Sequence, residues 1–151
     1  MTELERFLAD AKAEFGLEAS HEDFEQIRSL PEGFRSSCWH NNACPSLSAV
    51  PFDIGPRGYS ISCDIWIDAK EEEMRECGSG HQFSIVIGSD DGGQFAYGSD
   101  SWEDILVHAS QAYELLRAMY EEAVRRGDTD ALRVFVAYKY KAEALGFVAF
   151  Q

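Results

Sequence analysis

The clearest hydrophobic pattern in the chain is an alternation over residues 59–68, where every second residue, beginning with Tyr59, is apolar. Alternation with a period of two is typical of a β-strand that buries one face and leaves the other in contact with water. Shorter apolar segments bounded by Gly, Pro or Asp predict further strands. These segments are residues 34–40, 46–52, 82–88 and 94–97.

The residues between these segments predict how the strands are connected. Pro45 and Pro51 flank the segment 46–52, which favours an edge strand, because proline cannot donate a backbone hydrogen bond to a neighbouring strand. Asp90 and Asp91 are followed by two glycines, a sequence typical of a hairpin turn. We therefore expect a four- or five-stranded, mostly antiparallel sheet.

Helical periodicity occurs at both ends of the chain. Residues 2–16 predict an amphipathic helix, and residues 20–30 predict a second, shorter one. Residues 101–126 predict a long helix that Ser101 or Asp100 caps, with Asp104 at the capping position. Another helix is predicted over residues 128–146, with Tyr140 among the side chains that face the core. Helices that flank a set of strands, without β–α–β alternation, indicate an α+β fold. We expect the N-terminal helix and a C-terminal helical hairpin to pack on one face of the sheet.

Composition is consistent with one acidic α+β domain over residues 1–151. Hydrophobic residues make up 45% of the chain, which is enough for a core. The net charge is −14, so the protein is expected to be repelled by DNA and by anionic membranes. No apolar run is long enough to span a bilayer and no basic segment precedes an apolar run at the start. We therefore expect a cytoplasmic protein.

The acidic residues are concentrated in the first two thirds of the chain. Residues 1–104 hold 21 acidic and seven basic side chains, whereas residues 105–151 hold six of each. Solubility alone does not require such segregation. We therefore expect a non-enzymatic binding protein or inhibitor that occupies a basic surface on a nucleic-acid-binding protein. By analogy of size and charge, immunity proteins against nuclease toxins and phage inhibitors of host defence, including anti-CRISPR proteins, work in this way.

The residues expected to contact a partner lie on the polar side of the clearest strand and in nearby loops. Trp66 stands between two aspartates in this pattern, an arrangement common at binding hot spots, where the ring anchors and the charges orient the partner. The alternative is that a helix or the C-terminal tail covers this tryptophan. The expected partner-binding residues are Asp64, Trp66, Asp68, Glu71, Glu72, Glu73, Glu76, Asp90 and Asp91.

Cysteine and histidine residues raise a second hypothesis, a zinc site that makes the chain a zinc-binding protein or a small metalloenzyme. Zinc takes four such ligands in a tetrahedron, and two glycines lie between Cys77 and His81, where the chain has room to bend around an ion. The step from Cys38 to Cys44 is wider than the usual zinc-knuckle spacing. Because nothing indicates secretion, we expect reduced thiols. The candidate ligands are Cys38, His40, Cys44, Cys77 and His81.

No motif identifies an enzyme. The chain lacks the glycine-rich patterns that bind nucleotide phosphates, and its Asp-Asp-Gly-Gly stretch lacks the alternating ligands of a calcium loop. A third hypothesis is a structural or assembly subunit, which its oligomeric state would reveal. The leading hypothesis remains an acidic binding protein without catalytic residues.

Overall fold

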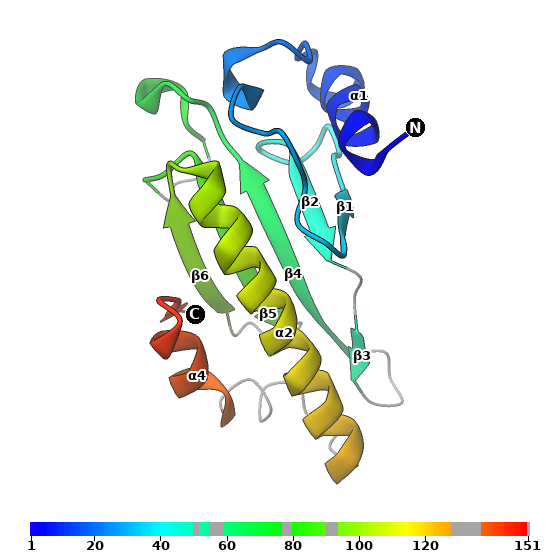
Figure 1. Ribbon diagram of the computed structural model, residues 1–151, viewed down its shortest axis with the longest axis vertical. Coiled ribbons are helices and arrows are strands. Elements are labelled where there is room, and N and C mark those ends of the chain that lie inside the picture. Colours follow the sequence, from blue (N-terminus) through cyan, green and yellow to red (C-terminus); the bar gives the residue numbers. More distant parts are fainter. Residues whose placement is uncertain (50–51, 55–58, 77–79, 90–93, 128–136, 151) are drawn as a thin grey trace.

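The computed structural model describes residues 1–49, 52–54, 59–76, 80–89, 94–127 and 137–150. Within them, one antiparallel sheet forms a layer and the long helix lies across it (Figure 1). The strands are β1 (Phe34–Ser36), β2 (Ser46–Ala49), β3 (Phe52–Ile54), β4 (Tyr59–Ile67), β5 (Phe83–Ser89), β6 (Gln94–Ser99) and β7 (Val148–Phe150). The helices are α1 (Glu3–Phe15), α2 (Trp102–Arg126) and α4 (Lys139–Ala144), with short 3-10 helices η1 (Glu22–Phe24) and η2 (Glu72–Met74).

The fold is α+β and the sheet is antiparallel, as predicted. The sheet contains more strands than the four or five expected. Six strands follow the order β1-β2-β4-β5-β6-β7, and β3 pairs with β4 beside β2. Two additional strands arise because the segment 46–52 contributes to both β2 and β3, and because the apolar C-terminal tail joins the sheet as β7. The prediction that 46–52 is an edge was wrong. Its residues 46–49 pair on both sides, and both prolines lie outside β2.

The core lies between the sheet and α2. Alternate residues of β4 from Ile61 to Ile67 are at most 1% exposed, as the sequence pattern predicts, and those of β5 from Phe83 to Ile87 are equally buried on the same face. α2 packs across β3, β4, β5 and β6, and α1 packs against β1. The largest buried side chains of the core are Phe7, Leu47, Ile61, Ile65, Ile67, Phe83, Ile85, Ile87, Phe95, Trp102 and Phe147.

The N-terminal helix is confirmed and the second predicted helix is not. The Thr2 hydroxyl accepts a hydrogen bond from the backbone N–H of Glu5 at 3.1 Å, and Gly16 ends α1 in the left-handed region at φ 72°. Residues 20–30 contain only the three-residue η1. The Trp102 backbone N–H donates to the Gln26 side-chain oxygen and the Trp102 indole donates to the Ser29 carbonyl, both at 2.9 Å, so this segment is tied to the start of α2.

The C-terminal third agrees with the sequence only in part. α2 begins after Ser101, whose hydroxyl accepts from the Asp104 backbone N–H at 3.3 Å, as the capping pattern predicts. α4 is the described part of the next predicted helix, and residues 128–136 lie outside the described residues, so the helical hairpin is not established. Tyr140 was expected to face the core and is 81% exposed. Among the described helices, none is both long and apolar enough to cross a membrane.

Candidate functional site

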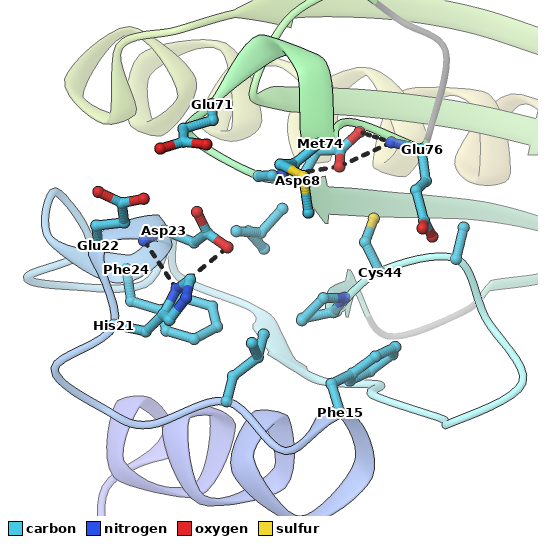
Figure 2. A pocket seen from close by; sticks show the side chains of 15 residues that line it. Phe15, His21, Glu22, Asp23, Phe24, Cys44, Asp68, Glu71, Met74 and Glu76 are labelled. Atoms are coloured by element: carbon cyan, nitrogen blue, oxygen red, sulfur yellow. Dashed lines mark hydrogen bonds and ion pairs between the residues drawn. The ribbon is translucent and has the colours of Figure 1, made fainter.

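A pocket of about 380 Å³ opens at the end of the sheet where β4 ends (Figure 2). Its wall is formed by η1, the end of α1, the segment just before β2 and the loop that joins β4 to β5. We call it the acidic pocket, because five carboxylates contribute to its lining. One histidine lies among them. These residues are His21, Glu22, Asp23, Asp68, Glu71 and Glu76.

Two acidic stretches that are about 50 residues apart in the sequence meet at this pocket because hydrogen bonds tie η1 to the β4–β5 loop. The Lys70 backbone N–H donates to the Asp23 carboxylate at 2.8 Å, and the Gln82 side-chain amide donates to the Asp23 carbonyl at 2.9 Å. The Lys70 ammonium pairs with Glu25 at 2.8 Å. The two walls of the pocket are therefore held at a fixed spacing.

Arg75 organises the β4–β5 loop from within. Its side chain is only 14% exposed and donates to the carbonyls of Ala69, Lys70 and Gly80 at 2.9, 3.0 and 3.1 Å. It also lies 3.5 Å from the Asp100 carboxylate. Because its donors face backbone carbonyls, this guanidinium supports the loop and does not line the acidic pocket.

Asp68 lies at the inner end of the pocket and is 4% exposed. Its carboxylate accepts the backbone N–H of Ala69 at 2.8 Å and that of Glu76 at 3.1 Å. A buried carboxylate held by backbone N–H groups keeps its negative charge at modest cost. Asp68 therefore contributes charge to the pocket while it closes the loop.

The outer carboxylates of the pocket differ from Asp68 because they reach solvent. Glu22, Glu71 and Glu76 are exposed, and the side chains of Glu71 and Glu76 form no ion pair among the described residues. No lysine or arginine in the described part of the chain lines the pocket. In Figure 2, Glu22 and Glu71 lie on one side of the pocket and Glu76 on the other. On the η1 side, Lys70 lies near Glu22 and Asp23, and His21 lies 3.2 Å from the Asp23 carboxylate. The negative charge of Glu71 and Glu76 is therefore the part of the opening that no ion pair among the described residues offsets.

Apolar side chains form the rest of the pocket wall. Phe24 is 4% exposed and packs edge-on against Phe7 with a ring-centroid distance of 5.8 Å, so its ring is held in place. Met74 is 64% exposed at the rim. The apolar lining includes Phe15, Leu17, Phe24, Ile67 and Met74. The pocket is therefore amphipathic, with apolar walls and an anionic opening.

The structure separates the residues that the sequence groups around Trp66. Asp64 and Trp66 are half-buried on the polar face of β4, whereas Asp68 lies in the acidic pocket. The Ser48 hydroxyl donates a short hydrogen bond to Asp64. Burial raises the pKa of the Asp64 carboxyl above its usual range, and this hydrogen bond opposes the rise. Asp64 is thus partly withdrawn from solvent by its neighbours.

The remaining predicted partner-binding residues divide between the described and undescribed parts of the chain. Glu72 and Glu73 form the exposed first turn of η2, immediately outside the acidic pocket. Asp90 and Asp91 lie outside the described residues. Five of the predicted residues, Asp68, Glu71, Glu72, Glu73 and Glu76, therefore gather in or beside the pocket.

The predicted zinc ligands are engaged in other contacts. Cys44 is disulfide-bonded, so the expectation of reduced thiols was wrong at this position, and its sulfur is not available as a thiolate ligand. His40 pairs with Glu14 at 2.9 Å, and His81 lies 3.8 Å from Asp100. Burial raises the pKa of the Cys38 thiol, which disfavours the thiolate that zinc needs.

The described residues do not assemble a metal site elsewhere. No group of three or more His, Cys, Asp or Glu side chains among them is arranged to hold an ion. Cys77, the last predicted ligand, lies outside the described residues. The carboxylates of the acidic pocket are accordingly spread around an opening and do not converge on one point.

Sequence reasoning missed the contribution of η1 to the pocket. The acidic run around Glu22 and Asp23 is visible in the sequence, but no local signal predicts that it meets the loop after β4. It also missed a cluster on the other side of the α2 base. There the Tyr97 hydroxyl donates to Asp104 at 2.6 Å, His108 pairs with Asp104 at 2.9 Å, and the Tyr97 and His108 rings stack at 3.7 Å.

Comparison with known proteins finds no relative of this chain. No protein-family model matches it, and neither a curated protein nor a solved structure does. A function therefore has to be inferred from the residues of the acidic pocket and their surroundings.

Proposed function

We propose that this protein is a non-enzymatic binding protein whose acidic end occupies a basic surface of another protein. The observation that carries the proposal is the unneutralised charge at the pocket opening, where Glu71 and Glu76 have no basic partner among the described residues. Glu72 and Glu73 extend the same charge beyond the pocket. A field of this kind attracts a complementary surface and raises the association rate.

The partner we propose is a nucleic-acid-binding protein. Such proteins carry basic surfaces that contact phosphate groups, and carboxylates held at a fixed spacing are suited to occupy the same surface. The fixed spacing comes from the hydrogen bonds between η1 and the β4–β5 loop. An inhibitor of a nuclease, such as a toxin immunity protein or an anti-defence protein of a phage, is the functional class that fits this mode of binding.

The alternative explanation of the charge is solubility, which makes a different prediction about its distribution. Charge that serves solubility is expected over the whole surface, with both signs interspersed. Here the acidic stretches of η1 and η2 meet at one end of the sheet (Figure 1). This concentration favours a binding function.

The experiment compares two variants that have the same net charge. The first replaces the four glutamates at the pocket and η2 by glutamine: Glu71→Gln, Glu72→Gln, Glu73→Gln and Glu76→Gln. The second makes the same change at four exposed glutamates elsewhere: Glu3→Gln, Glu5→Gln, Glu32→Gln and Glu121→Gln. Partners are recovered from a host lysate at low salt under non-reducing conditions, identified and purified, and association rates are measured by stopped flow.

We expect the logarithm of the association rate for the natural protein to fall steeply as salt rises. The first variant should associate roughly tenfold more slowly at low salt, and the second should change much less. Equal effects of the two variants would show that only net charge matters. Binding that does not depend on salt, or no binding to any basic protein, would count against the proposed function.

A further inference from the structure

The acidic pocket has the size and chemistry of a site for one side chain. Its volume of about 380 Å³ is at the lower end of the range of roughly 300–1,000 Å³ that is common for ligand sites. The walls are apolar and the opening is anionic. A ligand that matches both parts has an apolar stem and a cationic end. Lysine and arginine are the protein side chains with this construction.

We propose that the acidic pocket receives an arginine side chain of the partner protein. This inference rests on the proposed function and identifies the contact that anchors it. The guanidinium would lie among Glu22, Glu71 and Glu76 at the opening, with the aliphatic stem against the apolar wall. Charge complementarity selects a cation, because Glu71 and Glu76 form no ion pair among the described residues and no described lysine or arginine lines the pocket.

Two observations favour arginine over a metal ion or lysine. The described carboxylates do not form a group able to hold a metal ion, so the cation must be broad enough to reach separated oxygens. A guanidinium has five N–H donors in a plane and stacks on aromatic faces, whereas an ammonium is a compact, strongly hydrated charge. Phe15, which is partly exposed, supplies an aromatic ring in the pocket wall.

The surroundings of the pocket favour a protein partner over a free small cation. The exposed acids Glu72 and Glu73 lie on η2 and do not line the pocket. Met74 exposes 64% of its surface at the rim, where a partner surface would cover it. A protein that inserts an arginine would contact both features, whereas a free polyamine would contact neither completely.

The methionines of this chain provide a direct test. Met74 lines the pocket, Met119 is fully buried in the core and Met1 is exposed at the N-terminus. Methyl NMR of the natural protein would be recorded during titration with N-acetyl-arginine amide. The matched control is N-acetyl-citrulline amide, which has the same shape without the charge. N-acetyl-lysine amide and spermidine complete the set of probes.

We expect the arginine probe to shift the Met74 methyl signal with a dissociation constant on the order of 1 mM, as befits a small ligand. The signals of Met1 and Met119 should remain in place, citrulline should have no effect, and lysine should bind more weakly. Glu71→Gln with Glu76→Gln should weaken the arginine probe at least fivefold. Ala43→Phe, which narrows the pocket without changing charge, should also weaken it.

Several results would overturn the inference. They are an unshifted Met74 signal, an equal shift with citrulline, and tighter binding of lysine or spermidine than of arginine. Thermal unfolding of each variant would confirm that it is folded before its binding is interpreted. If the arginine probe fails while the partner still binds with a steep salt dependence, the pocket inference is wrong and the proposed function stands. If the arginine probe binds but no basic protein does, the proposed function is wrong and so is the anchoring role.

Discussion

Two acidic regions at the same end of the sheet use their carboxylates in opposite ways. At the start of α2, Asp104 accepts the Tyr97 hydroxyl at 2.6 Å and pairs with His108 at 2.9 Å. At the acidic pocket, Glu71 and Glu76 have no ion pair among the described residues. The difference shows that a count of acidic residues does not predict the field of a surface, because partners supplied by the fold cancel some charges and leave others.

The largest expected effect concerns the covalent support of the pocket wall. Cys44 lines the pocket, is 4% exposed and is disulfide-bonded. Reduction with a dithiol, or Cys44→Ser, should lower the free energy of unfolding by about 2–4 kcal/mol, because the cross-link restricts the unfolded chain. Urea unfolding with and without reductant measures this difference.

The matched control for the disulfide is Cys38→Ser. Cys38 carries a free thiol that is half-buried. Its replacement should therefore lower the free energy of unfolding by roughly 1 kcal/mol or less, which is smaller than the effect of losing the disulfide. Alkylation and mass spectrometry, before and after reduction, would report the state of each thiol. Equal unfolding midpoints with and without reductant would contradict a stabilising disulfide. A disulfide that survives in protein taken directly from cells would argue against the predicted cytoplasmic location.

The second effect tests whether the carboxylate at the base of α2 is structural. Asp104→Asn removes the charge that the Tyr97 hydroxyl and the His108 ring contact, and we expect a loss of about 1 kcal/mol in the free energy of unfolding. Glu103→Gln changes the neighbouring, exposed acid and should have no measurable effect. Equal losses in the two variants would remove the contrast between the two acidic regions.

The contact between Tyr97 and Asp104 also predicts how stability depends on pH. The hydrogen bond to Asp104, followed by burial, raises the pKa of Tyr97 to about 12, and the Tyr97 hydroxyl lowers the pKa of the Asp104 carboxyl. The Tyr97 contribution to stability is therefore complete below pH 10 and is lost as pH rises through 12. The contribution of Asp104 to stability is present above the ordinary pKa of an aspartate. It is lost as pH falls through the lowered pKa of Asp104. Ultraviolet absorption should show the Tyr97 pKa moving toward 10 in Asp104→Asn.

The smallest effect is expected at the acidic pocket itself. Glu71→Gln and Glu76→Gln break no ion pair with a described residue, so each should change the free energy of unfolding by less than about 0.5 kcal/mol. Any change should be stabilising at low salt, since each substitution relieves repulsion between neighbouring carboxylates. Thermal unfolding at low and high salt measures this. A loss above about 1 kcal/mol would place these glutamates in the structural class with Asp104.

Local patterns in the sequence were sufficient for three of the main elements, β4, α1 and α2. The alternation over 59–68 predicted β4, the helical periodicity over 2–16 predicted α1, and the capping pattern at Ser101 predicted the start of α2. These predictions succeed because the signals lie within a few residues of the structure they specify. Where the decisive contacts are distant, prediction failed. Residues 20–30 are held by Trp102 instead of forming a helix, and the tail joins β6 as β7.

The sequence by itself determined the acidity of this protein, its segregation into the first two thirds of the chain, and the strand that carries Asp64 and Trp66. Only the tertiary structure decided which carboxylates act together. Asp23 and Lys70 lie far apart in the chain, and their hydrogen bond places η1 beside the β4–β5 loop to make a pocket. Asp64 and Asp68, predicted as neighbours in one site, are separated because β4 ends at Ile67 and the chain turns into the loop. Charge is a property of composition, whereas a site depends on long-range contacts that no local pattern records.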